Sequence, residues 1–187
     1  MRIFIIHGYS ADVEAHWFPW LAEQLTAQGH RVSIVELPTP TAPVRQEWDA
    51  RLAAEIGTVD EDTLLIAHSL GTITALRFLS GLESGWRLGG FVSVAGFLGR
   101  LSVIPEIDNY LADSPEVAAL AARIDVRTMI YSDNDEVVPS TASRTLAELL
   151  GAEQVVVPGG GHFLADDGFT ELPEVLAAAE EVARQRR

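Results

Sequence analysis

Short apolar runs rich in β-branched residues alternate along this chain with longer segments whose apolar residues recur at helical spacing. This alternation is typical of βα units, which build a parallel sheet covered by helices. The runs are almost continuously apolar, as expected of strands buried on both faces. We therefore predict an α/β fold, a three-layer α/β/α sandwich around a six-stranded parallel sheet. The predicted strands are residues 3–7, 31–36, 63–67, 90–95, 127–132 and 154–157.

Helix signals separate these strands. One predicted helix begins at Pro19 and ends at Gly29, and a second follows the proline-rich residues 37–43. Ser114 and Pro115 have the pattern of a cap and a first-turn proline, which predicts a third helix. Further helices are expected over residues 141–150 and 171–186. The predicted apolar stripes are Trp17, Leu21 and Leu25, then Val44, Trp48, Leu52 and Ile56, then Val117, Leu120 and Ile124.

Residues 96–112 form the longest segment without a clear period. They include many large apolar side chains, too many for a loop surrounded by water. Two interpretations are open: the segment packs as an irregular part of the core, or it forms a small flap over a site.

The chain contains neither lysine nor cysteine, since all 13 of its basic residues are arginine. Without lysine, the chain has no means of Schiff-base chemistry, no pyridoxal phosphate anchor, no P-loop lysine and no Ser-Lys dyad. Without cysteine, thiol nucleophiles, thiolate metal sites and disulfides are excluded as well. Serine is therefore the main candidate for covalent catalysis.

Length and charge limit the class of protein further. The 187 residues suit one domain, expected over residues 1–187. The net charge of -14 disfavours nucleic acids and anionic membranes as partners, because both need a basic surface. The first apolar run leaves no room for a signal peptide, and no stretch reaches the ~18 apolar residues of a membrane span. We expect a cytoplasmic domain whose oligomeric state is open.

The segment Ala67-His68-Ser69-Leu70-Gly71 lies where a predicted strand ends and a predicted helix begins. It nearly matches the G-x-S-x-G nucleophile elbow, a strained turn that exposes the serine Oγ between small flanking residues. Ala67 stands where the pattern has its first glycine. The alternative interpretation is a serine that only caps a helix.

Acidic and histidine candidates follow this serine in the chain order of α/β-hydrolases. Asp133 and Asp135 come after the fifth predicted strand, and His162 follows three glycines after the sixth. Parallel strands bring their carboxyl ends to one edge of a sheet, so these loops are expected to converge with Ser69. Either aspartate is a candidate for the acid, and the other would cap a turn.

These motifs resemble those of small serine hydrolases of the retinoblastoma-binding-protein/YdeN type, within the α/β-hydrolase superfamily. The resemblance covers nearly the whole chain and includes His7-Gly8-Tyr9, residues 16–21, the elbow, Asp135-x-x-Val138-Pro139 and Gly161-His162-Phe163. In that family the acid lies three residues before a Val-Pro-like pair, which implies Asp135 rather than Asp133. The resemblance also implies the strand order 2-1-3-4-5-6 and a compact domain without a large cap.

The resemblance implies a triad of Ser69, His162 and Asp135. Ser69 would attack a carbonyl, His162 would carry its proton, and Asp135 would orient the imidazole. The tetrahedral oxyanion needs donors, for which we expect the backbone N–H groups of Tyr9 and Leu70.

Other candidate residues surround this triad. Trp17 and His68 are expected to line the substrate pocket, since the loop of Trp17 leaves the same sheet edge as Tyr9 and His68 flanks the serine. His7 and His68 are also expected to bond loops rather than metals. No histidine spacing matches a zinc motif, so we expect neither a metal nor another cofactor.

The sequence therefore predicts a serine hydrolase that cleaves a small carboxylic ester through an acyl-serine intermediate, with amides and thioesters as alternative substrates. The rival hypothesis is a non-catalytic binding protein that retains the hydrolase scaffold. The chain is short for an α/β-hydrolase, which predicts a shallow site.

Overall fold

Six strands form one sheet in the order β2-β1-β3-β4-β5-β6 in the computed structural model, which describes residues 1–112 and 115–186. Every neighbouring pair of strands is parallel. The predicted sheet and its strand order are therefore confirmed. The strands are β1 (Arg2–Ile6), β2 (Arg31–Val35), β3 (Thr63–His68), β4 (Leu88–Val94), β5 (Ile124–Ser132) and β6 (Glu153–Val157).

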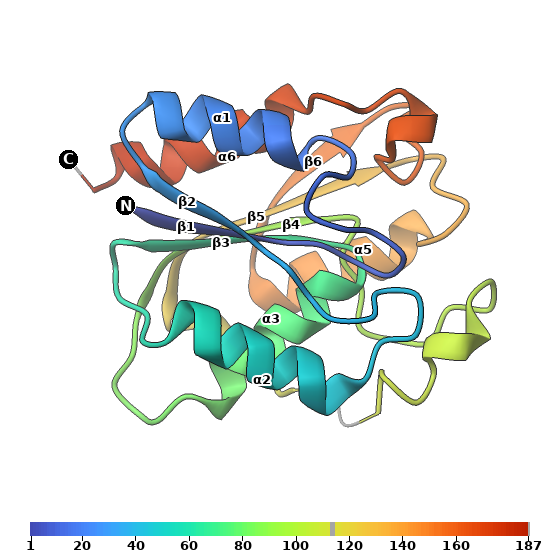
Figure 1. The fold of residues 1–187 in the computed structure, drawn as a ribbon, viewed down its shortest axis with the longest axis horizontal. Helices are drawn as coiled ribbons and strands as arrows, with labels where there is room; N and C mark the ends of the chain where they lie inside the picture. The colour runs from blue at the N-terminus through green and yellow to red at the C-terminus, as the bar shows by residue number, and fades with distance from the viewer. Residues whose placement is uncertain (113–114, 187) are drawn as a thin grey trace.

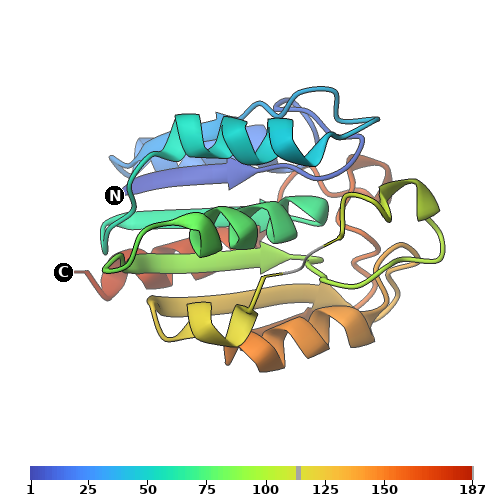
Figure 2. The ribbon, with the colours of Figure 1, turned by 90° about the horizontal axis from the view of Figure 1, so that it is seen from below.

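Helices cover both faces of this sheet, as the three-layer prediction requires. Helices α1 (Phe18–Ala27) and α6 (Pro173–Arg184) lie on one face (Figure 1). The other face carries α2 (Arg45–Ile56), α3 (Leu70–Gly81) and α5 (Ser140–Leu150), with the short α4 (Val117–Ala121) beside them (Figure 2). Among the described residues, no helix has both the length and the apolar character needed to cross a bilayer.

The core consists of two apolar clusters, one on each side of the sheet. Successive residues of a strand point to opposite faces. Accordingly Ile3 and Ile5 belong to the cluster beneath α1 and α6, whereas Phe4 and Ile6 belong to the cluster beneath α2, α3 and α5. Every residue of β3 and β4 is buried, which accounts for their continuous apolar sequence.

The two edge strands differ from the prediction of burial on both faces. Residues of β2 and β6 are mostly exposed or half-buried, because each strand has a neighbour on only one side and incomplete cover by helices. Their β-branched residues favour the extended backbone even without full burial.

Two details of the predicted helical stripes are wrong. Val44 is only the cap residue before α2 and is 43% exposed. Ile124 is the first residue of β5 and pairs with Leu88, so α4 ends earlier than its stripe predicts. The cap predicted at Ser114 lies outside the described residues, and α4 begins two residues after Pro115 rather than on it.

The segment 96–112 is irregular and only partly buried: its Ile107 and Tyr110 lie in the core, whereas Val103 is 58% exposed. It contains the single-turn 3-10 helix η1 (Pro105–Ile107), and its Tyr110 ring lies against Trp48 at 5.3 Å between centroids. The Tyr110 hydroxyl is 2.5 Å from Thr74 Oγ1, and the Arg77 guanidinium lies 4.5 Å from the ring centroid. Burial raises the pKa of Tyr110 to about 12, so this hydroxyl stays protonated. These contacts anchor the segment to α2 and α3.

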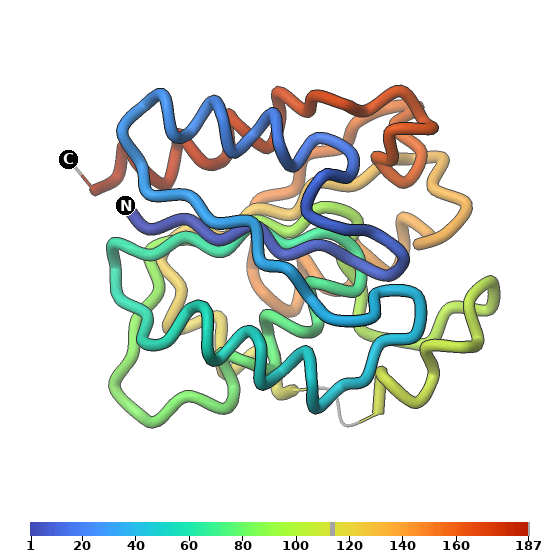
Figure 3. The backbone as a smooth tube through the Cα atoms, viewed as in Figure 1, coloured from blue at the N-terminus to red at the C-terminus, as the bar shows by residue number. Residues whose placement is uncertain are grey.

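The loops that follow the strands gather at one edge of the sheet, opposite the two termini (Figure 3). A second 3-10 turn, η2 (Ala165–Asp167), lies in the loop after β6. This edge is where the parallel topology places the candidate site.

Candidate active site

Ser69 occupies the sharp turn between β3 and α3. Its φ of 51° and ψ of -121° lie in a region that non-glycine residues rarely adopt. The Ser69 N–H donates to the carbonyl of Val94 at 2.9 Å, which ties the strained residue to the end of β4. Such strain is typical of a nucleophile elbow rather than of a serine that only caps a helix, and Ser69 makes no side-chain cap bond.

Gly71 allows α3 to approach β1 closely. A Cβ added there would lie 2.5 Å from the carbonyl oxygen of His7 and 2.6 Å from that of Ile6, distances that backbone atoms do not permit. Ala67, which replaces the first glycine of the elbow pattern, is fully buried in the core and pairs in register with Ile6. The space on that side of the elbow therefore accommodates a methyl group.

The three side chains implied as a triad form one hydrogen-bonded line. His162 Nε2 lies 3.0 Å from Ser69 Oγ, and His162 Nδ1 lies 2.7 Å from Asp135 Oδ2. The other carboxylate oxygen, Oδ1, accepts the backbone N–H groups of Val137 and Val138, both at 2.8 Å. The aspartate is thus held in one orientation, with Oδ2 facing the imidazole.

Asp133 has a different place in the structure. Its Oδ1 accepts the backbone N–H of Gly159 at 2.8 Å, and Asn134 Oδ1 accepts that of Gly161 at 2.9 Å. Asp133 therefore joins the loop between β5 and α5 (residues 133–139, the acid loop) to the loop between β6 and α6 (residues 158–172, the histidine loop). The prediction that the aspartate not used as the acid caps its own turn is wrong in this respect. Three consecutive residues, 133–135, bond the loop that carries His162.

Two further side chains that the sequence analysis missed hold the histidine loop. Asp167 Oδ2 accepts the N–H groups of His162 at 2.9 Å and Leu164 at 3.1 Å, while Ser132 Oγ donates to the carbonyl of Gly161 at 2.7 Å. An aspartate a few residues after a glycine-rich turn is a known acceptor for turn N–H groups, so Asp167 left a detectable signal in the sequence.

The loop after β1 runs directly beside the elbow. A Cβ added to Gly8 would lie 3.0 Å from Ser69 Cβ and 3.3 Å from the nitrogen of Leu70. Leu70 is the first residue of α3, so its N–H has no acceptor within the helix. The N-terminus of a helix also favours negative charge. The site can therefore present a backbone donor next to Ser69.

His7 sets the direction of the neighbouring peptide. Its Nε2 accepts the N–H of Leu37 at 3.1 Å, so Nδ1 carries the hydrogen and donates to the carbonyl of Gly8 at 2.9 Å. In a trans peptide the C=O and the following N–H point in opposite directions. By holding the Gly8 carbonyl, His7 directs the N–H of Tyr9 away from its own ring.

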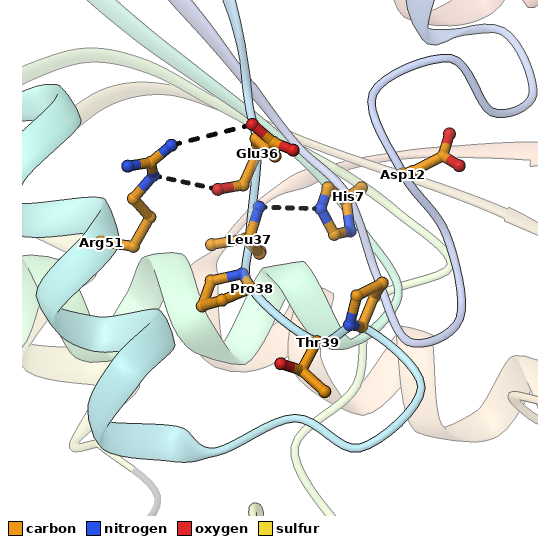
Figure 4. Close-up of a pocket in the computed structure, with 8 residues that line it drawn as sticks. His7, Asp12, Glu36, Leu37, Pro38, Thr39 and Arg51 are labelled. Carbon is orange, nitrogen blue, oxygen red and sulfur yellow. Dashed lines mark hydrogen bonds and ion pairs between the residues drawn. The ribbon is translucent and has the colours of Figure 1, made fainter.

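A cavity of about 320 Å³ adjoins this loop (Figure 4). His7 forms one wall, and Arg51 closes another by donating to the main-chain carbonyl of Glu36 at 3.0 Å. Ser69 is not among the residues that line it. Within residues 1–112 and 115–186, no group of three or more histidine or acidic side chains is arranged to hold a metal ion.

The two residues predicted to line the substrate pocket are both in the core. Trp17 has no exposed surface, and His68 is 2% exposed. Their rings lie 6.0 Å apart at the buried side of the elbow. The structure therefore does not support a direct role for either side chain in lining an open pocket.

Three histidines that are buried or half-buried make stability depend on pH. Burial lowers the pKa of His7 and His16, and it lowers the pKa of His68 well below the usual value. Below about pH 6.5 the unfolded chain binds protons that the folded chain does not, so the free energy of unfolding must fall as the pH falls. Each such histidine contributes a slope of at most about 1.4 kcal/mol per pH unit.

We expect urea denaturation between pH 7 and pH 5.5 to show this loss of stability. A His68→Gln variant should have a shallower dependence on pH than the natural chain, because one of the three groups is removed. Identical slopes for the two proteins would contradict the neutral state of His68.

The chain is similar in sequence and in structure to known proteins. The sequence model of a family described as serine hydrolase matches residues 3–181. YdeN of Bacillus subtilis strain 168 is 38% identical over 174 residues, which cover 93% of this chain and 92% of YdeN. The crystal structure of the ydeN gene product matches with a TM-score of 0.94 at 37% identity, covering 98% of both chains. Est1E from Butyrivibrio proteoclasticus shares the fold, with a TM-score of 0.73 at 16% identity over 98% of this chain and 87% of Est1E.

Proposed function

The chain belongs to the serine hydrolase family and has the α/β-hydrolase fold, and from this premise we propose that it cleaves a small carboxylic ester through an acyl-serine intermediate. Amides and thioesters are alternative substrates for the same chemistry. The observation that carries the proposal is the hydrogen-bonded line from Ser69 Oγ through His162 to Asp135.

Acylation begins with Ser69. Its Oγ attacks the substrate carbonyl carbon while its proton moves to His162 Nε2, which lies 3.0 Å away. The carbonyl π pair moves onto oxygen and gives a tetrahedral oxyanion. When this collapses, the bond to the leaving alkoxide breaks and His162 returns the proton to it. A water molecule then repeats the sequence on the acyl-serine, releasing the acid and restoring Ser69.

The oxyanion is bound by backbone donors. The N–H of Leu70 is free of helical acceptors, and the N–H of Tyr9 is directed by the bond between His7 and the Gly8 carbonyl. Donors fixed before the reaction need no reorganisation in the transition state, and losing one costs on the order of 3 kcal/mol in the barrier.

Asp135 determines which nitrogen of His162 carries the hydrogen at rest. Its Oδ2 can only accept, so His162 Nδ1 donates and Nε2 is left free to accept the proton of Ser69. The carboxylate also stabilises the imidazolium formed during each step. Because Val137 and Val138 hold Oδ1, this orientation does not depend on substrate.

The rival hypothesis of a binding protein without turnover explains fewer observations. A scaffold that only binds ligands has no use for the strained backbone of Ser69 or for a serine within 3.0 Å of a histidine. These features support catalysis over binding alone.

Covalent labelling tests the proposal. We expect a fluorophosphonate probe to modify the native protein at a single residue, and peptide mass spectrometry to locate the adduct on Ser69. Urea-denatured protein is the control and should not react, because the triad geometry is lost. A native protein that is not labelled, or is labelled elsewhere, would overturn the assignment of the nucleophile.

A further inference from the structure

His68 is the last residue of β3 and directly precedes Ser69. Its imidazole is almost completely buried, and the mechanism above gives it no part. Four aromatic rings surround it at centroid distances of 5.0 to 6.0 Å, those of His16, Trp17, Phe18 and His162. A polar ring buried in such surroundings destabilises the fold unless hydrogen bonds within the protein replace those it made to water.

The bond that His68 makes is to the backbone of His162. Its Nε2 lies 3.0 Å from the main-chain carbonyl oxygen of that residue. Because a carbonyl can only accept, Nε2 must carry the hydrogen. Nδ1 is buried and has no hydrogen-bond partner among the described residues. Burial, assisted by the nearby His162, lowers the pKa of His68, so the ring stays neutral in this one tautomer.

Two consecutive residues of the elbow therefore contact the same histidine at two different points. Ser69 Oγ meets the His162 ring at Nε2, and His68 meets the His162 backbone at its carbonyl, each at 3.0 Å. On the other side, Asp167 accepts the His162 N–H at 2.9 Å. The ring that must reach Ser69 thus projects from a backbone that is held at both its donor and its acceptor.

The backbone after His162 needs this support. Phe163 has a φ of +59°, and Gly161 before it has a φ of +53°, so the histidine lies between two left-handed residues. Phe163 is not glycine, and such a conformation persists only where the surroundings enforce it. The bond from His68 reaches the carbonyl of the peptide that enters Phe163.

We propose that His68 is a positioning residue for His162: by holding the His162 carbonyl to the strand end that also carries Ser69, it keeps His162 Nε2 within hydrogen-bonding distance of Ser69 Oγ. The proposal rests on the proposed function, because it assumes that His162 is the general base. It explains why a buried imidazole, rather than an apolar side chain, precedes the serine.

Two amide variants test the bond to the carbonyl. The side-chain nitrogen of glutamine reaches about as far as Nε2 of histidine, whereas that of asparagine is one methylene shorter. We expect His68→Asn to lower kcat for an activated ester by about 10- to 100-fold with KM changed less than about twofold, and His68→Gln to stay within about threefold of the natural chain. Equal kcat in all three proteins, or equal losses in both variants that follow their melting temperatures, would overturn the proposal.

A measurement on the unmodified protein keeps the test independent of folding in the variants and of catalysis. With histidine labelled with both ¹⁵N and ¹³C, NMR should show His68 protonated at Nε2 and coupled across the hydrogen bond to the carbonyl carbon of His162. His68 protonated only at Nδ1 would overturn the positioning role. If instead Ser69 fails to react while this coupling is present, the proposed function fails and the structural tie stands.

Discussion

Replacing Ser69 with alanine is expected to lower kcat/KM for an activated short-chain ester by roughly 10⁴- to 10⁶-fold. Alanine removes the hydroxyl that we propose forms the acyl bond, and neither cysteine nor lysine exists in the chain to replace it. Any turnover that remains comes from backbone donors acting on water-mediated hydrolysis. Steady-state and burst kinetics with a p-nitrophenyl ester measure both effects, and the burst should disappear.

A matched control separates this result from loss of structure. Ser80 is exposed near the end of α3, the helix that begins directly after Ser69, so Ser80→Ala should leave kcat/KM unchanged. The melting temperature of Ser69→Ala should stay close to that of the natural chain, because the change removes one hydroxyl and creates no cavity in the core. A Ser69→Ala protein that retains more than about a tenth of the activity would exclude the acyl-serine route, given the losses expected for a nucleophile.

The six strands were predictable because each leaves a strong local signal, whereas their order in the sheet was supplied by the family resemblance. The ends of helices and strands were less predictable where one pattern of apolar residues fits both a helix and a strand. Val117, Leu120 and Ile124 have helical spacing, yet Ile124 begins β5 because it pairs with Leu88 of β4. That pairing joins residues far apart in the sequence, and no local pattern contains it.

The candidate site was likewise predictable only in part from the sequence. Chain order and strand ends bring Ser69 and His162 to one edge of the sheet, where the structure places them 3.0 Å apart. The residues alone did not show which of Asp133 and Asp135 is the acid, since the two lie two positions apart in the same loop. Only the fold shows which carboxylate faces the imidazole, and family resemblance supplied that choice in its place.

Burial was the property that sequence reasoning judged least well. Trp17 and His68 flank the site in the sequence, which suggested an open pocket, but both side chains turn into the core. Position beside a candidate site residue does not determine where a side chain points. His68 is the last residue of β3, and successive residues of a strand point to opposite faces. The role proposed for His68 became visible only when the path of the histidine loop was known.

Asp135→Asn is expected to lower kcat by about 10⁴-fold without a comparable change in stability. The backbone N–H groups of Val137 and Val138 both bond Oδ1, so the amide oxygen of the variant must take that place. The amide NH₂ then faces His162 Nδ1 and forces it to accept. The hydrogen of the neutral imidazole moves to Nε2, which can no longer take the proton of Ser69.

Asp133→Asn is the matched control for this change. Its Oδ1 accepts one backbone N–H, that of Gly159, and an amide oxygen can accept the same bond. We therefore expect a loss in kcat of less than about tenfold, the cost of weakening a bond to a charged acceptor that supports the histidine loop. The ratio of the two losses identifies the acid: a large loss in Asp133→Asn with a small one in Asp135→Asn would transfer the role to Asp133. Comparable losses in both would mean that the acid loop acts through its bonds to the histidine loop rather than through one carboxylate on the imidazole.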